Sequence, residues 1–575
     1  MKKYRWKSIV SIITILTLLL PLNPLTGMAA ENFPTTGFED RSGEGYTTHA
    51  EELAFLEAVS QQSERMSYSQ VGTTVEGRPL HLVRIGYPTP PSDTDIAAGR
   101  SILIVGSQHG NEPAGREAAL QLLRDLAFTE DPELLDQMSE TTVLVIPSAN
   151  PDGREANTRG NAWGVDVNRD HLNLRTPEGQ TIAQVLRDFT PEITIDAHEG
   201  PSAPNNPGQT PRLELSWPRN LNVDEELRAL NVEMVEDYVF PAIEAQGFDT
   251  DVYGSPGGAG GGDERISRNV LGLRHGIGML IETFNATPAA RVDLQLRTIH
   301  EVLKFHRERG DDVARVVTEA PHRKMAAGGD QSEPFYLGGS DWEPPTEEDI
   351  LDVPPCGYVI NTVQAERIER LVSLFSLETE TVSENGVFIT MNQPMMTVVP
   401  LLLDERAAFN EVDGIALYDC SDPGSVEPPT PPEQSDPAQY ETDFTEYTFG
   451  ERPDGWSSLW RDSSWTVRDE PTRLEHVVGT DGGRRALTWD MVGEVHGDVE
   501  ISGVVRAQGA RDTMLQIGFH MSGDGGSENA YYLDVKHPEA SSAPNRVRIN
   551  RYQDGAFTGL GSMELPFTVS ENTWY

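Results

Sequence analysis

The stretch SILIVGSQHGNEPAGREAA, residues 101–119, holds the signals that decide the fold of the region around it. Apart from its serine, the run SILIV is apolar and rich in β-branched residues, which predicts a buried strand. A short loop with a histidine and a glutamate follows, and residues 117–127 then repeat apolar side chains at helix spacing. A strand that leads through a loop into a helix is the repeating unit of a sheet with parallel strands.

Three more apolar runs follow the same plan. They occupy residues 141–147, 191–197 and 276–282, with helical patterns at residues 181–189, 223–245 and 291–309. We therefore predict an α/β fold class, in which a mostly parallel or mixed sheet is flanked by helices. Sheets of this kind bind ligands beyond the carboxyl ends of their strands. Polar groups follow or close the four runs: His109, the turn sequence Asn150-Pro-Asp-Gly, His198 and Glu282.

The residues after the first and third runs predict a metal site. His109 and Glu112 offer two ligands on one loop, and His198 offers a third from a neighbouring strand end. A catalytic zinc takes about three such protein ligands and keeps one position open. Histidine and glutamate are also common in solvated loops, so their spacing alone is a weak signal. Their placement after two strands favours one Zn²⁺ in this domain.

Two further kinds of group are predicted near the metal. Glu282 closes the apolar run IGMLI, where partial burial would raise its pKa and suit it to take a proton from water. A strand-end glutamate in solvent is the alternative. Arg159 and Arg169 lie in the loop 150–170, and a guanidinium there would bind a carboxylate or stabilise an oxyanion. Either arginine could instead pair with the many acidic residues of this chain.

Taken in order, HGNE, NPDG, TRGNAWGVDVNRD, DAH and GMLIET resemble the funnel-type zinc carboxypeptidase family, over roughly residues 40–315. The resemblance implies the carboxypeptidase A-like fold. It also implies that His109, Glu112 and His198 are the zinc ligands. Glu282 would be the general base that activates water.

The same resemblance implies how a substrate is held. Arg159 would polarise the scissile carbonyl, while Asn168 and Arg169 would bind the free C-terminal carboxylate. The sequence YGSPGG is similar to the family's segment with a mobile tyrosine, so Tyr253 is a candidate substrate-binding residue. The long glycine-rich loop that follows departs from the family pattern.

That loop would shape the pocket for the terminal side chain. Asp263 and Glu264 in it would favour a basic terminal residue, although acidic residues are common throughout the chain. His171 and His275 lie near the motifs and are interpreted as ordinary polar residues.

The predicted function is that of a secreted, zinc-dependent metallocarboxypeptidase, whose partner is a peptide or protein with a free C-terminal carboxylate. Two alternatives share this type of ligand set: a zinc deacylase of N-acyl amino acids and a peptidase of peptidoglycan stem peptides. A non-catalytic binding protein on the same fold would be expected to lack a ligand or the general base. Here all of these residue types are present.

Changes in composition and periodicity along the chain divide it into predicted parts. Basic residues, an apolar run and then small residues predict a secretory signal peptide, and short alternating strands near the C-terminus predict a jelly-roll sandwich. This sandwich resembles a laminin-G-like or concanavalin-like module, and would either contact a glycan or the cell surface or act as a spacer. We predict a signal peptide at residues 1–29, a catalytic domain at 30–320, a small α+β domain at 321–420, a Pro-rich acidic linker at 421–440, and a β-sandwich at 441–575 that is cut short.

Charge, the leader and the cysteines add four expectations. The net charge is −46, from 91 acidic against 45 basic residues, which excludes binding of nucleic acid through charge. Such acidity is typical of adaptation to high salt, where screening weakens self-repulsion. The leader predicts a secreted or cell-envelope-associated protein. In that setting Cys356 and Cys420 are expected to form a disulfide, with two buried thiols as the alternative.

Overall fold

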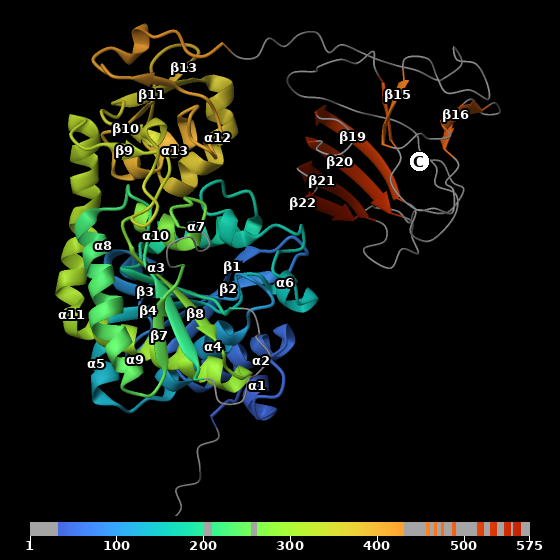
Figure 1. The fold of residues 1–575 in the computed structure, drawn as a ribbon. Coiled ribbons are helices and arrows are strands. Elements are labelled where there is room, and N and C mark those ends of the chain that lie inside the picture. The colour runs from blue at the N-terminus through green and yellow to red at the C-terminus, as the bar shows by residue number, and fades with distance from the viewer. Residues whose placement is uncertain are drawn as a thin grey trace, which may run out of the picture.

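The computed structural model describes residues 33–200, 210–254 and 261–430, together with the backbone of strands between residues 456 and 564. An eight-stranded sheet in the order β1-β2-β4-β3-β5-β8-β6-β7 forms the centre of residues 33–330 (Figure 1). Its strands are β1 (Met66–Thr73), β2 (Pro79–Ile85), β3 (Arg100–Gly106), β4 (Thr141–Ile146), β5 (Ile193–Ala197), β6 (Arg212–Ser216), β7 (Asp249–Val252) and β8 (Ile277–Phe284).

The sheet is mixed. The inner strands β4, β3, β5 and β8 run parallel to one another, and β6 is parallel to β7. The pairs β1–β2, β2–β4 and β6–β8 are antiparallel. The predicted strands at 101–105, 141–147, 191–197 and 276–282 correspond to the parallel inner strands, whereas the sequence did not predict the four strands at the edges.

Helices cover both faces of this sheet. They are α1 (Gly37–Asp40), α2 (His49–Gln62), α3 (Asp93–Ala98), α4 (Ala114–Phe128), α5 (Pro132–Glu140), α6 (Pro151–Ala156), α7 (Pro177–Phe189), α8 (Glu225–Val232), α9 (Phe240–Glu244), α10 (Ser267–Leu273) and α11 (Pro288–Asp330). A π-helical stretch, Glu233–Val239, joins α8 to α9, so the predicted helix 223–245 is one helical segment of changing pitch.

Alternating side chains of β3 divide the core into two layers. Ile102 and Ile104 belong to the cluster that includes residues of α4 and α11, while Leu103 and Val105 belong to the cluster with α7. All the residues of β3 after Arg100 are buried. A strand buried on both faces explains why SILIV has no polar–apolar alternation.

Two predicted elements differ in extent or type. The helix predicted at 291–309 continues to Asp330 as α11, past Gly310 and Pro321, because Val313 and Val316 remain buried against the core. It therefore crosses residue 320, where the sequence placed a domain boundary. The turn predicted from NPDG is the start of α6, because the Asn150 side chain accepts from the Gly153 N–H as an N-cap and Pro151 fills the first helical position.

Residues 331–430, here called the accessory unit, form a small α+β arrangement at one end of the sheet domain (Figure 1). A four-stranded antiparallel sheet in the order β12-β13-β11-β14 packs with α12, and Cys356 and Cys420 form the expected disulfide. Its elements are β9 (Phe335–Tyr336), β10 (Ile350–Leu351), β11 (Gly357–Asn361), α12 (Thr362–Phe375), β12 (Thr379–Thr381), β13 (Gly386–Thr390), α13 (Val399–Leu403) and β14 (Ile415–Leu417).

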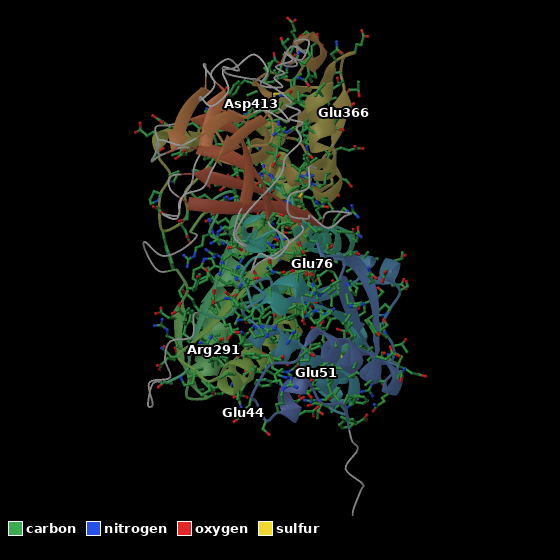
Figure 2. All side chains as sticks on the ribbon, turned by 90° about the vertical axis from the view of Figure 1, so that its right-hand side faces the viewer. Glu44, Glu51, Glu76, Arg291, Glu366 and Asp413 are labelled. Atoms are coloured by element: carbon green, nitrogen blue, oxygen red, sulfur yellow. A yellow bond between two sulfur atoms is a disulfide. The ribbon has the colours of Figure 1, made fainter. Side chains whose placement is uncertain are left out.

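The start of the predicted linker lies against this unit. Val426 packs with the apolar cluster that includes Cys420, and the Asn361 amide donates to the Pro429 carbonyl at 3.0 Å. Acidic side chains such as Glu44, Glu366 and Asp413 are exposed on the outside of both the sheet domain and the accessory unit (Figure 2).

The C-terminal region contains described strands. They are β15 (Trp456–Trp460), β16 (Trp465–Arg468), β17 (Arg473–His476), β18 (Ala486–Trp489), β19 (Met514–Ser522), β20 (Asn529–Lys536), β21 (Arg546–Gln553) and β22 (Ala556–Glu564). The last four form an antiparallel sheet. The predicted signal peptide lies outside the described residues, and the jelly-roll sandwich stays a prediction. Among the described residues, no helix combines the length and the apolar character needed to cross a membrane.

Candidate metal centre and active site

Three neighbouring strands bring the predicted site residues together. His109 lies just after β3, His198 directly follows β5, and Glu282 belongs to β8. The His198 N–H donates to the Ile281 carbonyl at 2.8 Å, which fixes the ends of β5 and β8 side by side. Glu112 reaches the same point from the loop before α4. Parallel pairing of β3, β5 and β8 thus explains why residues far apart in sequence converge.

His109, Glu112 and His198 form a compact group that could hold a metal ion. The Nδ1 atoms of the two histidines are 3.0 Å apart. Glu112 Oε1 lies 2.9 Å from His109 Nδ1, and its Oε2 lies 2.9 Å from His198 Nδ1. Both imidazoles are buried, so little solvent competes for these atoms.

Each of these two histidines contacts an aspartate through Nε2, the ring nitrogen that faces away from the cluster. His109 Nε2 lies 3.0 Å from Asp166 Oδ1, and His198 Nε2 lies 2.8 Å from Asp196 Oδ1. A carboxylate on the far nitrogen orients the ring and makes the ligating nitrogen a better donor. Sequence reasoning missed both aspartates. The position of Asp196, two residues before His198, is a signal that could have found it, whereas Asp166 stands 57 residues from His109.

His171 extends this arrangement one step further. Its Nε2 lies 2.7 Å from Gln108 Oε1, and the Gln108 amide donates to Asp196 Oδ1 at 2.5 Å. His171 is thus part of the network behind a ligand. His275 lies elsewhere, with Nε2 2.8 Å from the Pro394 carbonyl of the accessory unit.

The geometry of the imidazoles fits a bound cation. With an aspartate at each Nε2, the favoured tautomer carries its proton on Nε2 and leaves Nδ1 as an acceptor. In this tautomer two acceptor nitrogens and a carboxylate converge and repel one another, and a divalent cation between them removes the repulsion; without a cation, a proton on either Nδ1 takes its place and forms a hydrogen bond to Glu112. A set of two histidines and one glutamate suits zinc, and leaves room for a fourth ligand.

The two carboxylates of the site have opposite acidities. Burial acts to raise the pKa of Glu112, but hydrogen bonds with His109 and His198 outweigh it and hold this pKa below its usual range. Burial raises the pKa of Glu282 to about 8, helped by the negative charge of Glu112 and opposed by His198. The Glu282 side chain is buried, and its Oε2 has no hydrogen-bond partner. Glu282 is therefore poised to exchange a proton near neutral pH.

Arg159 lies at the edge of this cluster. Its Nε donates to Asp166 Oδ2 at 2.9 Å, and its Nη1 donates to Glu112 Oε1 at 3.3 Å. The side chain is 47% exposed, so part of the guanidinium faces the solvent side of the site. Arg159 therefore joins one proposed ligand to the aspartate that supports another.

Asn168 and Arg169 lie on the same loop but face different neighbours. Asn168 Nδ2 is 3.2 Å from His198 Nε2, and its Oδ1 accepts from the Ser267 N–H at 2.8 Å. Arg169 does not contact the histidine cluster in the described part of the chain. Its Nη1 donates to the Asn168 carbonyl at 2.8 Å, and its Nε lies 3.8 Å from Asp263 Oδ2.

Tyr253 follows β7, and its N–H donates to the Leu215 carbonyl at 2.8 Å. Burial raises the pKa of its phenol, and the negative charge of Glu282 raises it further, so the hydroxyl stays protonated near neutral pH. This electrostatic coupling means that Tyr253 lies within the field of the site.

The two acidic residues of the following loop behave differently from the expectation for a basic substrate. Asp263 forms a two-point ion pair with Arg265, at 3.1 and 3.0 Å. Glu264 is buried, and burial raises its pKa to about 7. Asp263 is therefore already neutralised by Arg265, and Glu264 is only partly charged near pH 7.

A pocket of about 340 Å³ opens beside Glu112. Tyr46, Asn157, Glu199 and Arg291 are among the residues that line it. Arg291 Nη1 donates to Glu199 Oε2 at 2.9 Å and to the Gly200 carbonyl at 2.8 Å, so the two charges neutralise each other. The site thus has a polar recess next to the candidate metal ligands, and the ion pair inside it is neutral overall.

Residues 52–241 match the family model described as zinc carboxypeptidase. This segment belongs to the zinc carboxypeptidase family. The segment contains His109, Glu112 and His198, and Glu282 lies beyond its end. Residues 33–330 are called the carboxypeptidase domain from here on.

Several proteins similar to the carboxypeptidase domain are themselves named carboxypeptidases. Carboxypeptidase 2 of Trichophyton rubrum is 30% identical over 266 residues, which cover 43% of this chain and 48% of that protein. The probable carboxypeptidase 2 of Trichophyton verrucosum is 29% identical over 269 residues, 43% of this chain and 50% of that protein. The chain spans about half the length of these relatives. A solved metallo-carboxypeptidase from Pseudomonas aeruginosa is 20% identical with a TM-score of 0.38, over 46% of this chain and 69% of that chain.

Proposed function

We propose that this chain is a zinc metallocarboxypeptidase of the funnel type that removes residues from the C-terminus of peptides. The observation that carries the proposal is the trio of His109, Glu112 and His198 with Glu282 in the adjacent strand, whose Oε2 has no hydrogen-bond partner. A trio alone suits any zinc protein. The neighbouring base with a raised pKa is what hydrolysis adds to it.

When bound, a zinc ion supplies Lewis-acid polarisation of the scissile carbonyl and activation of water. Glu282 takes the proton of the attacking water and delivers it to the leaving amine. Its raised pKa makes both transfers feasible near neutral pH, because the acid and base forms are close in free energy. Burial keeps competing water away from this carboxyl.

Two arginines account for charge on the substrate. Arg159 stabilises the oxyanion that develops from the carbonyl, since its guanidinium is tethered beside Glu112 and still partly exposed. Arg169, with Asn168 beside it, binds the free C-terminal carboxylate. Tyr253 donates a hydrogen bond from its phenolic hydroxyl to the bound peptide.

We also propose export after removal of residues 1–29, and contact of the C-terminal sandwich with a glycan or the cell surface.

The experiment compares one peptide with a free C-terminus and the same peptide with a C-terminal amide, in high salt. We expect single residues to be released from the free peptide only, and a chelator to abolish release. An N-acyl amino acid and a peptidoglycan stem peptide serve as alternative substrates. Hydrolysis of either one, with no release from the free peptide, would replace the carboxypeptidase by the deacylase or the stem-peptide enzyme.

A further inference from the structure

The accessory unit touches the loop that faces Arg169. The centre of the Phe409 ring, in the accessory unit, lies 3.5 Å from the Arg265 guanidinium carbon. A guanidinium over an aromatic face is attracted to the ring electrons. Phe409 is itself anchored to the carboxypeptidase domain, because its carbonyl accepts from the Asn173 amide at 2.9 Å. Glu411, two residues on, accepts from the same amide at 2.6 Å.

Arg265 in turn holds Asp263. Two hydrogen bonds, at 3.1 and 3.0 Å, join the guanidinium to both carboxylate oxygens. Arg169 is the second cation near this carboxylate, but it stays 3.8 Å away and is 32% exposed. Two arginines therefore compete for one aspartate, and Arg265 has the better geometry. The charge of Arg169 remains largely available for a substrate carboxylate.

A second part of the accessory unit supports the same loop. The Asn220 amide donates to the Gly262 carbonyl at 3.1 Å, and Asn220 also forms a β-bridge with Ser340. Gly262 packs so closely against the backbone of Gly339 that a Cβ there would lie 1.7 Å from its carbonyl oxygen. The loop residues 261–265 are thus held by the accessory unit from two directions.

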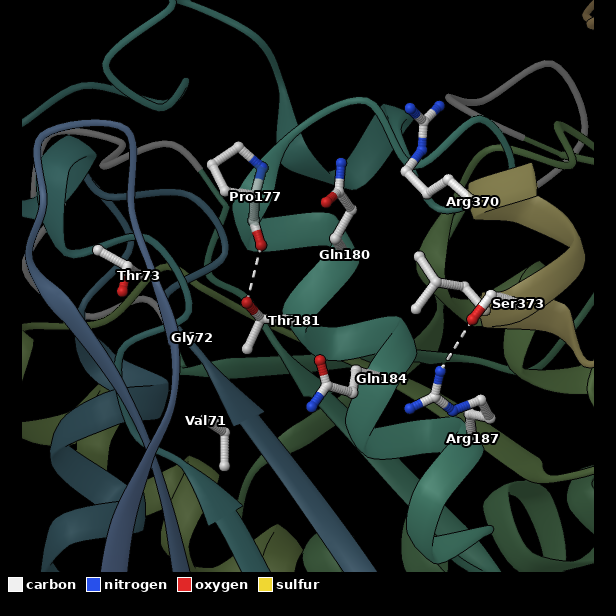
Figure 3. A pocket seen from close by; sticks show the side chains of 11 residues that line it. Val71, Gly72, Thr73, Pro177, Gln180, Thr181, Gln184, Arg187, Arg370 and Ser373 are labelled. Carbon is white, nitrogen blue, oxygen red and sulfur yellow. Dashed lines mark hydrogen bonds between the residues drawn. The ribbon is translucent and has the colours of Figure 1, made fainter. Parts of the chain in front are cut away.

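The two parts also meet away from this loop: Thr397 Oγ1 donates to the Leu273 carbonyl at 2.6 Å, and the Arg274 guanidinium lies over the Phe375 ring. A polar groove of about 430 Å³ opens between β1, α7 and α12 (Figure 3). The Arg187 guanidinium donates to Ser373 Oγ at 3.3 Å across it, and the exposed Gln184 lies beside this contact. The contact with the loop 261–265 is therefore one part of a larger interface, and it is the part that reaches the neighbourhood of Arg169.

We infer that the accessory unit is a positioning element for substrate binding: Phe409 holds Arg265 on Asp263 and so keeps Arg169 free to bind the substrate carboxylate. This inference rests on the proposed function of Arg169. Without the ring, Arg265 leaves Asp263, and Asp263 pairs with Arg169 and neutralises it. Phe409 and Arg265 act through Arg169 and are positioning residues.

The test measures kcat and KM of the full chain for release of a C-terminal residue. We expect Phe409→Ala to raise KM roughly three- to tenfold, the range for loss of one partly desolvated cation–π contact, with kcat changed less than about twofold. Phe409→Tyr keeps the aromatic face and should keep the wild-type KM. Ser373→Ala removes the hydrogen bond across the groove and is the matched control, expected to leave KM unchanged.

A second substitution separates this role from a structural one. If Asp263 neutralises Arg169 in Phe409→Ala, then adding Asp263→Asn should return KM toward the wild-type value. Mere loosening of the loop would not be rescued by removing a charge. Phe409→Leu, which keeps apolar volume, replaces Phe409→Ala if that variant does not fold.

The inference is overturned if Phe409→Ala, or Phe409→Leu in its place, keeps the wild-type KM. It is also overturned if Asp263→Asn leaves the raised KM unchanged. An inactive wild type would instead overturn the proposed function, and the inference would fall with it.

Discussion

The site contains two buried glutamates that the fold treats in opposite ways. Glu112, between His109 and His198, has partners for both carboxylate oxygens, and its pKa is lowered. Glu282, one strand away, has an oxygen without a partner, and its pKa is raised. Because both carboxylate oxygens of Glu112 have partners, this side chain stays negatively charged and can bind a cation. Because an oxygen of Glu282 lacks a partner, its carboxyl can gain or lose a proton near neutral pH. The difference supports the two proposed roles, in which Glu112 binds the metal and Glu282 transfers a proton.

The largest expected effect comes from the isolated carboxyl. Glu282→Gln keeps the shape of the side chain but cannot accept a proton, so kcat should fall about 10²- to 10⁴-fold while KM changes little. Metal content, measured by atomic absorption, should equal that of the wild type because Glu282 is not among the three proposed ligands. A variant that retains most of its kcat would mean that another group is the base.

The next largest effect tests the residues that support the candidate metal ligands. Asp166→Asn weakens the support behind His109 Nε2 and should lower metal affinity about 10- to 100-fold, measured by competition with a chelator. Asp311→Asn, at a fully exposed aspartate, is the control and should leave the affinity unchanged. Unaltered affinity in Asp166→Asn would show that His109 needs no support from this carboxylate.

A separate effect concerns stability against pH in the chelated protein. The pKa of Glu282 rises from an ordinary 4.5 to about 8 on folding, so the native state binds more protons than the unfolded state between these values. Stability should therefore fall as pH rises from 4.5 to 8, by on the order of 4 kcal/mol.

Glu282→Gln removes this contribution. Its urea midpoint should exceed that of the wild type at pH 8 by more than it does at pH 5. Parallel pH profiles for the two proteins would indicate that Glu282 titrates normally. A variant that is both less active and more stable would show that the isolated carboxyl is kept at a cost in stability.

Much of the site was predictable because its residues stand at strand ends. Runs such as SILIV are buried on both faces, so they read clearly, and His109 and His198 follow two of them. The outermost strands β1 and β7 were missed because they are only partly buried: every residue of β7 is exposed or half-buried, which leaves no continuous apolar run. Helix α11 was cut short at Gly310 because only tertiary packing overrides the glycine and proline signals.

The contacts of the accessory unit could not be read from the sequence. Phe409 and Arg265 are 144 positions apart, and no periodic pattern links an aromatic ring to a distant guanidinium. Asp263 looked like a candidate for binding a basic side chain, although Arg265, its partner in the structure, stands only two residues later. Pairing between side chains of separate units is set by packing, which composition and spacing do not encode.

Helix α11 runs for 43 residues along both the carboxypeptidase domain and the accessory unit (Figure 1). At 1.5 Å per residue this is a rod of about 65 Å. The two parts are therefore joined by a continuous helix rather than by a flexible linker. Any rotation of one part against the other must bend this helix. Pro321, which lacks an amide hydrogen, is where bending costs least. A rotation that moved Phe409 away from Arg265 is therefore resisted by α11.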